Sequence, residues 1–166
     1  MRIPLPDLCD AFPDEVRVAE PVFRSYGGYD AFHGEITTIK CFEDNSLVAE
    51  KLAGSGSGNG DGRVLVVDAG GSLRCGMLGD NLAQAAVDHG WSGVVVYGCI
   101  RDVDQIKQLP LGVQALAAHP MKSVKRGTGQ YDQALSFAGI TVMPGEYLYA
   151  DRNGLLVAAA PLQLAG

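Results

Sequence analysis

The sequence predicts an α/β fold: one layered β/β/α domain over residues 1–166, with a parallel strand–helix–strand core and added antiparallel strands. Apolar strand-like runs alternate with helix-like segments over residues 34–118, as in parallel sheets with right-handed crossovers. The stretch 138–160 contains short strand-like runs joined by P-G and N-G turns, which indicate antiparallel hairpins. The length of 166 residues suits one domain, and no repeat or domain boundary is visible.

The first half of the chain supplies the beginning of this core. Residues 5–12 form a short predicted helix, and the alternating, β-branched run 34–42 forms a strand. Asp44 or Asn45 is expected to cap a helix in the segment 43–53. The glycine-rich stretch 54–62 is predicted to be a surface loop, because it matches no phosphate-binding motif and precedes a strand instead of following one.

The second half repeats the pattern. A buried strand is expected over residues 63–71, a helix over 78–90 that Gly90 ends, and a strand from Trp91 that stops at Gly98. A short helix follows in residues 102–109, with Asp102 as its expected cap, and then a strand over 112–118. Residues 119–132 form a polar loop with a local basic patch.

Composition restricts the function. The net charge of −6 and the pI of about 4.9 argue against direct binding of nucleic acid, whose phosphates an acidic protein repels. We expect a cytoplasmic protein without a membrane partner, because there is neither a signal-peptide core nor a run of about 20 apolar residues. The four scattered cysteines lack zinc-site spacing and are expected to be reduced, mostly buried residues.

The residues most suited to chemistry follow two neighbouring strands. Ligands of open α/β sheets bind beyond the carboxyl ends of strands, where this chain places Gly79-Asp80-Asn81-Leu82 at a helix start and Arg101-Asp102 after a strand. A helix start favours anions, and the planar fork of an arginine suits a carboxylate. Two aspartates offer the hard oxygen ligands that Mg²⁺ or Mn²⁺ prefers. The turn can therefore hold an anion and a metal together.

A structural interpretation competes at each of these positions. Arg101 and Asp102 could be a surface pair in which Asp102 only caps the next helix, and Asp80 could be an ordinary first-turn acid. Asp68 is expected to be structural, and Tyr97 and Cys99 to line the pocket wall. The histidines are also expected to be structural, and no lysine is expected at these strand ends.

The segment 78–106, LGDNLAQAAVDHGWSGVVVYGCIRDVDQI, resembles the RraA-like family, and within it the class II, divalent-metal aldolase branch. Further similar segments follow in the family order: EPVFRSYGG, KCFEDNSLV, VLVVDAGGSLR, LGVQALAAHPMKS and YADRNGLLV. The resemblance implies a swivelling-domain-like fold. It also implies 4-hydroxy-4-methyl-2-oxoglutarate aldolase activity, a retro-aldol cleavage giving pyruvate, often accompanied by decarboxylation of oxaloacetate.

The resemblance also assigns roles. It implies that Asp102 ligates Mg²⁺ or Mn²⁺ and that Arg101 and Asp80 are catalytic, Asp80 reaching metal-bound water. Gly79, Asp80, Asn81, Leu82 and Arg101 would bind the small 2-oxo acid. The 2-oxo acid would chelate the metal, and the metal would stabilise a pyruvate enolate, since no lysine stands out as a Schiff-base former. Aldolase members often carry leucine in place of Asn81, and longer members add an acid from a neighbouring subunit that this chain does not evidently possess.

Two further expectations concern partners. A homotrimer is expected, from the resemblance and from the apolar tail GLLVAAAPLQLAG, residues 154–166. The alternative function is a non-catalytic regulator that binds and inhibits an RNA-degrading endonuclease, which would make a ribonuclease a partner. Some family members with this role lack the acid that follows the arginine. Asp102 therefore favours the enzyme.

Overall fold

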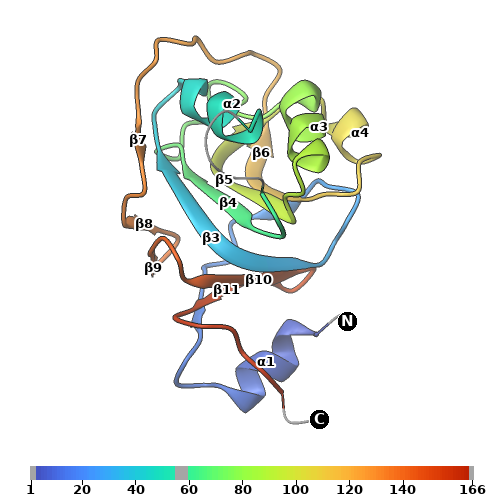
Figure 1. Cartoon of the computed structure of the whole chain (residues 1–166), viewed down its shortest axis with the longest axis vertical. Coiled ribbons are helices and arrows are strands. Elements are labelled where there is room, and N and C mark those ends of the chain that lie inside the picture. The colour runs from blue at the N-terminus through green and yellow to red at the C-terminus, as the bar shows by residue number, and fades with distance from the viewer. Residues whose placement is uncertain (1–2, 55–59, 165–166) are drawn as a thin grey trace.

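The computed structural model describes residues 3–54 and 60–164, and within them nine strands form one curled mixed sheet with the order β1-β11-β10-β3-β4-β5-β6-β2 and with β7 beside β3 (Figure 1). The strands of this sheet are β1 (Arg17–Val18), β2 (Arg24–Ser25), β3 (Phe32–Lys40), β4 (Val64–Asp68), β5 (Gly93–Ile100), β6 (Gly112–Ala118), β7 (Gln130–Tyr131), β10 (Tyr147–Asp151) and β11 (Gly154–Ala158). The helices are α1 (Leu5–Ala11), α2 (Ser46–Leu52), α3 (Asp80–Asp88) and α4 (Val103–Ile106), and a separate hairpin joins β8 (Leu135–Phe137) to β9 (Ile140–Val142).

The predicted parallel core is confirmed. Strands β3, β4, β5 and β6 pair in parallel in that order, and β10 and β11 extend β3 with antiparallel pairing. The described parts of the predicted segments contain the expected helices and strands, with ends that differ by a few residues. Residues 55–59 of the predicted glycine-rich loop lie outside the described residues.

The sheet separates two apolar layers. Leu65 and Val67 of β4 face the layer beneath the helices, whereas Val64 and Val66 face the layer shared with β8–β11. Both faces of β4 are therefore buried, which explains why this strand is a continuous apolar run without alternation. Figure 1 shows α2, α3 and α4 together at one end of the molecule, with α1 at the other.

Strand β5 does not stop at Gly98 as predicted; it continues to Ile100. Its register against β6 shifts between Val96 and Cys99, so the glycine lies in an irregular stretch of the strand. A Cβ on Gly98 would lie 2.8 Å from the Cβ of Ala69, which is too close. The glycine therefore permits close packing against the end of β4 and does not terminate the strand.

Much of the apolar tail packs against other parts of the same chain. Leu155, Leu156, Val157 and Ala158 of β11 are all buried, and Leu162 packs against the cluster around α1. The tail by itself therefore does not indicate an oligomer, because much of its apolar surface is already covered within the chain. Within the described residues, no helix reaches the length and apolarity that a membrane span requires.

The cysteines behave as predicted. All four are free, and Cys41, Cys75 and Cys99 are buried. Burial raises the pKa of the Cys41 thiol to about 12 and raises the pKa values of Cys75 and Cys99 as well. These thiols are therefore protonated near neutral pH and have little nucleophilic character.

Candidate functional site

One cavity of about 210 Å³ brings together all six residues that the sequence predicted for the site. Its walls combine the start of α3, the turn after β5 and the segment that follows β6. The lining residues are Asn45, Gly76, Gly79, Asp80, Asn81, Leu82, Arg101, Asp102, Lys122, Ser123 and Lys125. The cavity thus lies beyond the carboxyl ends of β5 and β6, where ligand sites of such sheets form.

Asp102 occupies the N-cap position of α4, but its side chain does not cap that helix as predicted. Its backbone is in the left-handed region, with φ of +58°. This conformation accompanies a carboxylate that accepts a hydrogen bond from the backbone N–H of Asp80 at 3.0 Å through Oδ2. Asp102 therefore stabilises the start of α3, where a negative charge also complements the helix dipole.

Gly79 makes room for this carboxylate. A Cβ at this position would lie 2.8 Å from Oδ2 of Asp102. The backbone φ of Gly79 is −118°, which any residue can adopt, so conformational freedom does not require the glycine here. A glycine is required because the carboxylate of Asp102 approaches the backbone so closely.

Arg101 is held at both its backbone and its side chain. Its N–H donates to the carbonyl oxygen of Leu78 at 2.9 Å, and its Nη1 donates to the carbonyl oxygen of Pro120 at 3.3 Å. The aliphatic part of the side chain packs on Gly76. A Cβ added to this glycine would lie 3.1 Å from Cβ and Cγ of Arg101. These contacts place a guanidinium group in the wall of the cavity, beside the carboxylate of Asp102.

The start of α3 presents three residues in different ways. Oδ1 of Asp80 accepts a hydrogen bond from the N–H of Asn81 at 2.9 Å, so this half-buried carboxylate stays close to the helix start. The side chain of Asn81 is exposed, whereas Leu82 packs against the core beneath the helices. Asn81 can therefore offer the site its backbone more readily than a fixed side chain.

The strand-end turns themselves contain no lysine, but a later segment of the chain brings two lysines to the cavity. Lys122 and Lys125 both line the cavity. They come from the segment that runs from β6 to β7 across the end of the molecule occupied by α2 (Figure 1). The basic patch at 119–132 was visible in the sequence, but no local pattern indicated that it would fold back onto Arg101.

Asn45 and Asp44 attach this segment to the rest of the site. Asn45 donates to the carbonyl oxygen of Met77 at 3.1 Å and accepts a hydrogen bond from Nζ of Lys125 at 3.0 Å. Asp44 is 2% exposed and accepts hydrogen bonds from the N–H groups of Arg126 and Thr128 at 2.9 and 3.0 Å. Two adjacent residues at the start of α2 therefore bind a segment about 80 positions later.

The charge of Asp44 is also fixed by these contacts. Burial alone would raise the pKa of its carboxyl group, but hydrogen bonds from Ser46 and Thr128 outweigh burial and hold the pKa well below its usual range. The hydroxyl of Ser46 donates at 2.5 Å and that of Thr128 at 2.8 Å. The anchor is therefore ionised across the whole physiological pH range.

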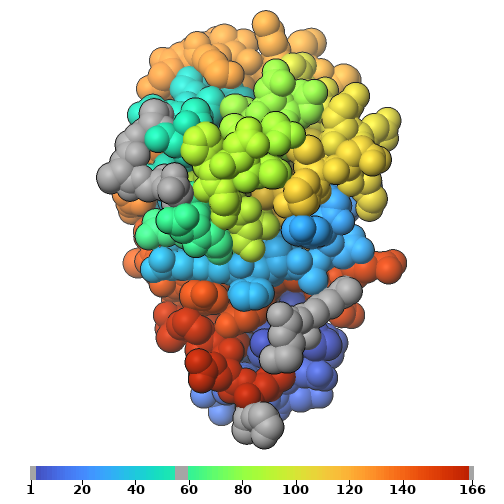
Figure 2. All heavy atoms as spheres, turned by 45° about the vertical axis from the view of Figure 1, so that its right-hand side comes forward, coloured from blue at the N-terminus to red at the C-terminus, as the bar shows by residue number. Residues whose placement is uncertain are grey.

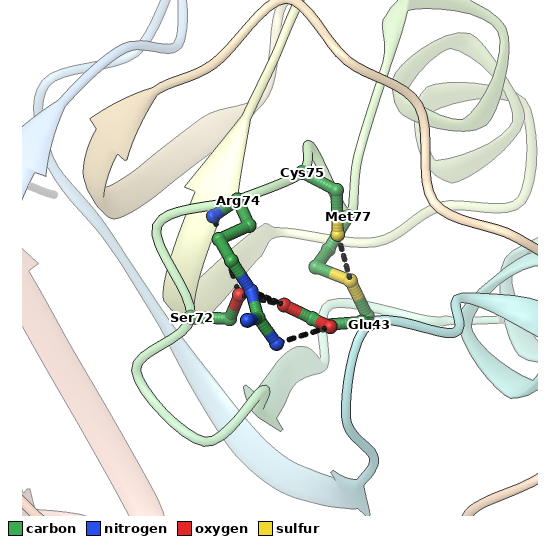
Figure 3. A network of polar contacts seen from close by, with 5 residues as sticks. All are labelled: Glu43, Ser72, Arg74, Cys75 and Met77. Carbon is green, nitrogen blue, oxygen red and sulfur yellow. Dashed lines mark hydrogen bonds and ion pairs between the residues drawn. The ribbon is translucent and has the colours of Figure 1, made fainter.

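A larger hollow of about 490 Å³ adjoins the cavity and shares Lys122 and Ser123 with it. Part of its wall is the network in Figure 3, where Nε and Nη2 of Arg74 donate to Glu43 at 2.6 and 2.8 Å and Ser72 donates to the same carboxylate. The hydrogen bonds from Arg74 and then Ser72 lower the pKa of Glu43. The guanidinium fork of Arg74 is thus already occupied.

Asp68 makes structural contacts, and the two residues expected in the pocket wall are not there. Asp68 accepts the N–H of Gly70 at 2.9 Å and lies 3.7 Å from Nζ of Lys40. Tyr97 stacks on Phe137 in the β-rich layer, and Cys99 is fully buried, so neither lines the cavity. None of the three histidines lines it either.

The residues around the cavity suit a Mg²⁺-type ion that keeps several waters. They do not suit a metal that protein side chains alone must coordinate. Within residues 3–54 and 60–164, no three His, Cys, Asp or Glu side chains gather to hold a metal. Oδ1 of Asp102 makes no hydrogen bond in that part of the chain, which leaves one carboxylate oxygen available. Mg²⁺ commonly keeps several waters and takes one or two carboxylates together with substrate oxygens. The residues present therefore fit such an ion.

The chain matches a protein family and curated relatives over most of its length. The family model "RraA-like: Aldolase/RraA" matches residues 5–157. A Pseudomonas fluorescens strain Pf-5 protein named "Putative 4-hydroxy-4-methyl-2-oxoglutarate aldolase" is 60% identical over 96% of this chain and 95% of its own length.

Two solved structures are also similar. The Thermus thermophilus structure called the RNA-processing inhibitor RraA has a TM-score of 0.92 and 44% identity, covering 98% of this chain and 96% of its own. A Geobacillus kaustophilus structure named S-adenosylmethionine:2-dimethylmenaquinone methyltransferase has a TM-score of 0.91 and 47% identity, covering 96% and 97%. The family match over most of the chain, together with these relatives, shows that this chain belongs to the RraA-like family.

Proposed function

We propose that this chain is a divalent-metal-dependent carbon–carbon lyase. It would cleave 4-hydroxy-4-methyl-2-oxoglutarate to pyruvate by a retro-aldol reaction and would also decarboxylate oxaloacetate. The observation that carries the proposal is the placement of Arg101 and Asp102 in one cavity with the N-terminus of α3. That arrangement offers a cation, an available carboxylate oxygen and a helix start to the same small anion. The aldolase name of relatives up to 60% identical supports the same activity.

Each group of residues in the cavity would have a different role in the reaction. Asp102 would hold the metal through Oδ1, and the N-terminus of α3 at Gly79 to Leu82 would bind the substrate carboxylate. Arg101 would neutralise negative charge that develops on the 2-oxo oxygen as the bond between C3 and C4 breaks. When bound, a divalent cation supplies Lewis acidity toward the same 2-oxo acid group.

Asp80 is the proposed proton acceptor. In the retro-aldol direction the hydroxyl group on C4 loses its proton, the C3–C4 electron pair moves toward C3, and a proton is then delivered to C3 to give the second pyruvate. The Asp80 carboxylate lines the cavity and would take up the first proton through a water molecule. Decarboxylation of oxaloacetate breaks the corresponding bond and releases CO₂, so it needs Arg101 but no hydroxyl proton acceptor.

The test is release of pyruvate from each substrate by the purified chain, with Mg²⁺ or Mn²⁺ and with an excess of chelator. We expect turnover with the metal, loss with the chelator and recovery when metal is added back. Pyruvate release that a chelator does not affect would contradict a metal-dependent mechanism. No pyruvate release from either substrate would contradict the lyase itself.

A second function has one observation in its favour. The Thermus thermophilus relative, at 44% identity over nearly its whole length, is called an RNA-processing inhibitor. A ribonuclease partner is therefore the alternative, in which this chain binds and inhibits an RNA-degrading endonuclease without turnover. Inhibition of such an endonuclease by a chain that shows no lyase activity would favour this alternative.

We also propose that the chain assembles as a homotrimer. Phe42, Met121 and Val124 are more than half exposed, and all three line the larger hollow beside the candidate site. Exposed apolar side chains that gather in this way commonly mark an interface. Light scattering at micromolar concentration should give three times the mass of 17.5 kDa, and a species of 17.5 kDa alone would exclude the assembly.

A further inference from the structure

Two cations in the candidate site, Lys122 and Lys125, have no role in the proposed chemistry. Lys122 lines the cavity together with Arg101, yet the steps above use only Arg101, Asp80, Asp102 and the start of α3. Within the described residues, the side chain of Lys122 makes no hydrogen bond or ion pair. Lys125, by contrast, donates its Nζ to Asn45 at 3.0 Å. Lys122 is thus a cation available to a ligand.

The backbone around Lys122 is firmly placed beside Arg101. Lys122 and Gly76 form a β-bridge, and the N–H of Gly76 donates to the carbonyl oxygen of Met121 at 2.7 Å. The side chain of Arg101 packs on the same glycine and donates to the carbonyl oxygen of Pro120. Arg101 and Lys122 therefore flank Gly76, and their relative position follows from several contacts.

Lys122 also lies where the two hollows meet. It lines both the 210 Å³ cavity and the adjoining 490 Å³ hollow. The fork of Arg74, another cation of the larger hollow, is occupied by Glu43. A ligand that fills the cavity and extends into the larger hollow would therefore pass the uncommitted ammonium group of Lys122.

We propose that Lys122 is a specificity-determining residue that binds the second carboxylate of a 2-oxo dicarboxylate. The inference rests on the proposed function, in which Arg101, Asp102 and the start of α3 hold the 2-oxo acid end. The other carboxylate of such a substrate lies several bonds away, and needs a cation outside that group of residues. A charge-assisted hydrogen bond from Lys122 supplies it, and a 2-oxo monocarboxylate gains nothing from it.

Calorimetric titration in Mg²⁺ buffer tests this with two stable probes, 2-oxoglutarate and 2-oxobutanoate. We expect the wild-type chain to bind the dicarboxylate at least tenfold more tightly, which corresponds to one charge-assisted hydrogen bond. Lys122→Met should reduce this preference to about twofold or less while changing the Kd of 2-oxobutanoate by less than twofold. Lys122→Arg keeps the charge and should retain most of the preference.

Lys107→Met is the matched control. Lys107 is an exposed lysine after α4 that lines neither hollow, so its removal changes the net charge equally and should keep the preference. Thermal melting of each variant establishes that the fold is intact. A Lys122→Met variant that keeps the wild-type preference would overturn the assignment, and so would a wild-type chain that binds neither probe.

The same measurements separate this assignment from the lyase. If the wild-type chain shows a preference that depends on Lys122 but releases no pyruvate, the lyase fails and the dicarboxylate site stands. If the chain is an active lyase and Lys122→Met keeps the preference, the lyase stands and the site fails. The binding ratio is measured with unreactive probes, so it does not depend on turnover.

Discussion

The carboxylate of Asp102 accepts a hydrogen bond from the backbone N–H of Asp80 at 3.0 Å, so the turn after β5 and the start of α3 are joined directly. One oxygen of Asp102 serves this structural contact, and the other makes no hydrogen bond in the described chain. A residue with this geometry can stabilise a helix and hold a metal at the same time. Substitutions near this contact should therefore affect catalysis and stability to different degrees.

Gly79→Ala should reduce catalysis more than stability. The added Cβ would lie 2.8 Å from Oδ2 of Asp102, so the carboxylate must move away from the Asp80 N–H. We expect a loss of about 1 kcal/mol in the free energy of unfolding, typical of a lost helix cap. The kcat/KM for oxaloacetate should fall at least tenfold, because Asp102, the proposed metal ligand, is displaced.

Asn81→Ala is the control for that variant. The side chain of Asn81 is exposed, and the substitution leaves every backbone N–H of the helix start in place. Its kcat/KM should stay within about twofold of wild type. If Gly79→Ala proves as active as Asn81→Ala, the close packing of Asp102 on Gly79 has no catalytic importance.

Arg101→Lys should be far more harmful than a charge-conserving change usually is. Lysine keeps the positive charge but loses the planar fork and the Nη1 hydrogen bond to Pro120. The loss of one charge-assisted hydrogen bond in the transition state corresponds to a decrease of about 10- to 100-fold in kcat/KM for oxaloacetate. Arg63→Lys, at an exposed ion pair with Glu35 near the opposite end of β4, should change kcat/KM little. Equal kcat/KM values for Arg101→Lys and Arg63→Lys would mean that Arg101 does not bind the substrate in the transition state.

Asp44→Asn should destabilise the chain in a pH-dependent way. The folded-state pKa of Asp44 lies below its unfolded value of about 3.9, so the ionised group adds stability that is fully present well above that pH. As the pH falls below about 4 toward the folded pKa, the unfolded state takes up a proton and this advantage is lost. Unfolding with urea should show a deficit of about 2 kcal/mol for Asp44→Asn at pH 7.

The same deficit should stay constant between pH 7 and pH 5 and should shrink below pH 4. Comparison of wild type and variant at each pH removes the contributions of other groups to first order. A deficit that is the same at pH 3 as at pH 7 would contradict the role of an ionised Asp44 in holding residues 126–128.

The sequence was sufficient for the parallel core and for placing the candidate site residues near one another. Apolar runs at Val64–Asp68 and Gly93–Ile100 identify strands that pair in parallel, and the carboxyl ends of such strands share one edge of a sheet. Arg101 and Asp102 therefore had to lie near the helix that precedes their strand. The prediction needed only local patterns and the right-handed crossover rule.

Two features of the site depend on contacts that no local pattern reveals. The residues DVDQI after Arg101 are typical of a helix with an aspartate cap, but the left-handed backbone of Asp102 accompanies a side chain directed to α3. Lys122 and Lys125 belong to an irregular segment whose position follows from hydrogen bonds to Asp44 and Asn45. Such long-range contacts form only in the folded chain.

The most direct test of the account is the kcat/KM of Asp102→Asn for oxaloacetate in the presence of Mg²⁺. The asparagine Oδ1 can still accept the Asp80 N–H, so the free energy of unfolding should change by no more than about 1 kcal/mol. The site would lose its proposed anionic metal ligand, and we predict that kcat/KM falls at least 100-fold, or about 2.7 kcal/mol in the barrier. A well-folded variant that keeps wild-type, chelator-sensitive activity would contradict the assignment of Asp102 as the metal ligand.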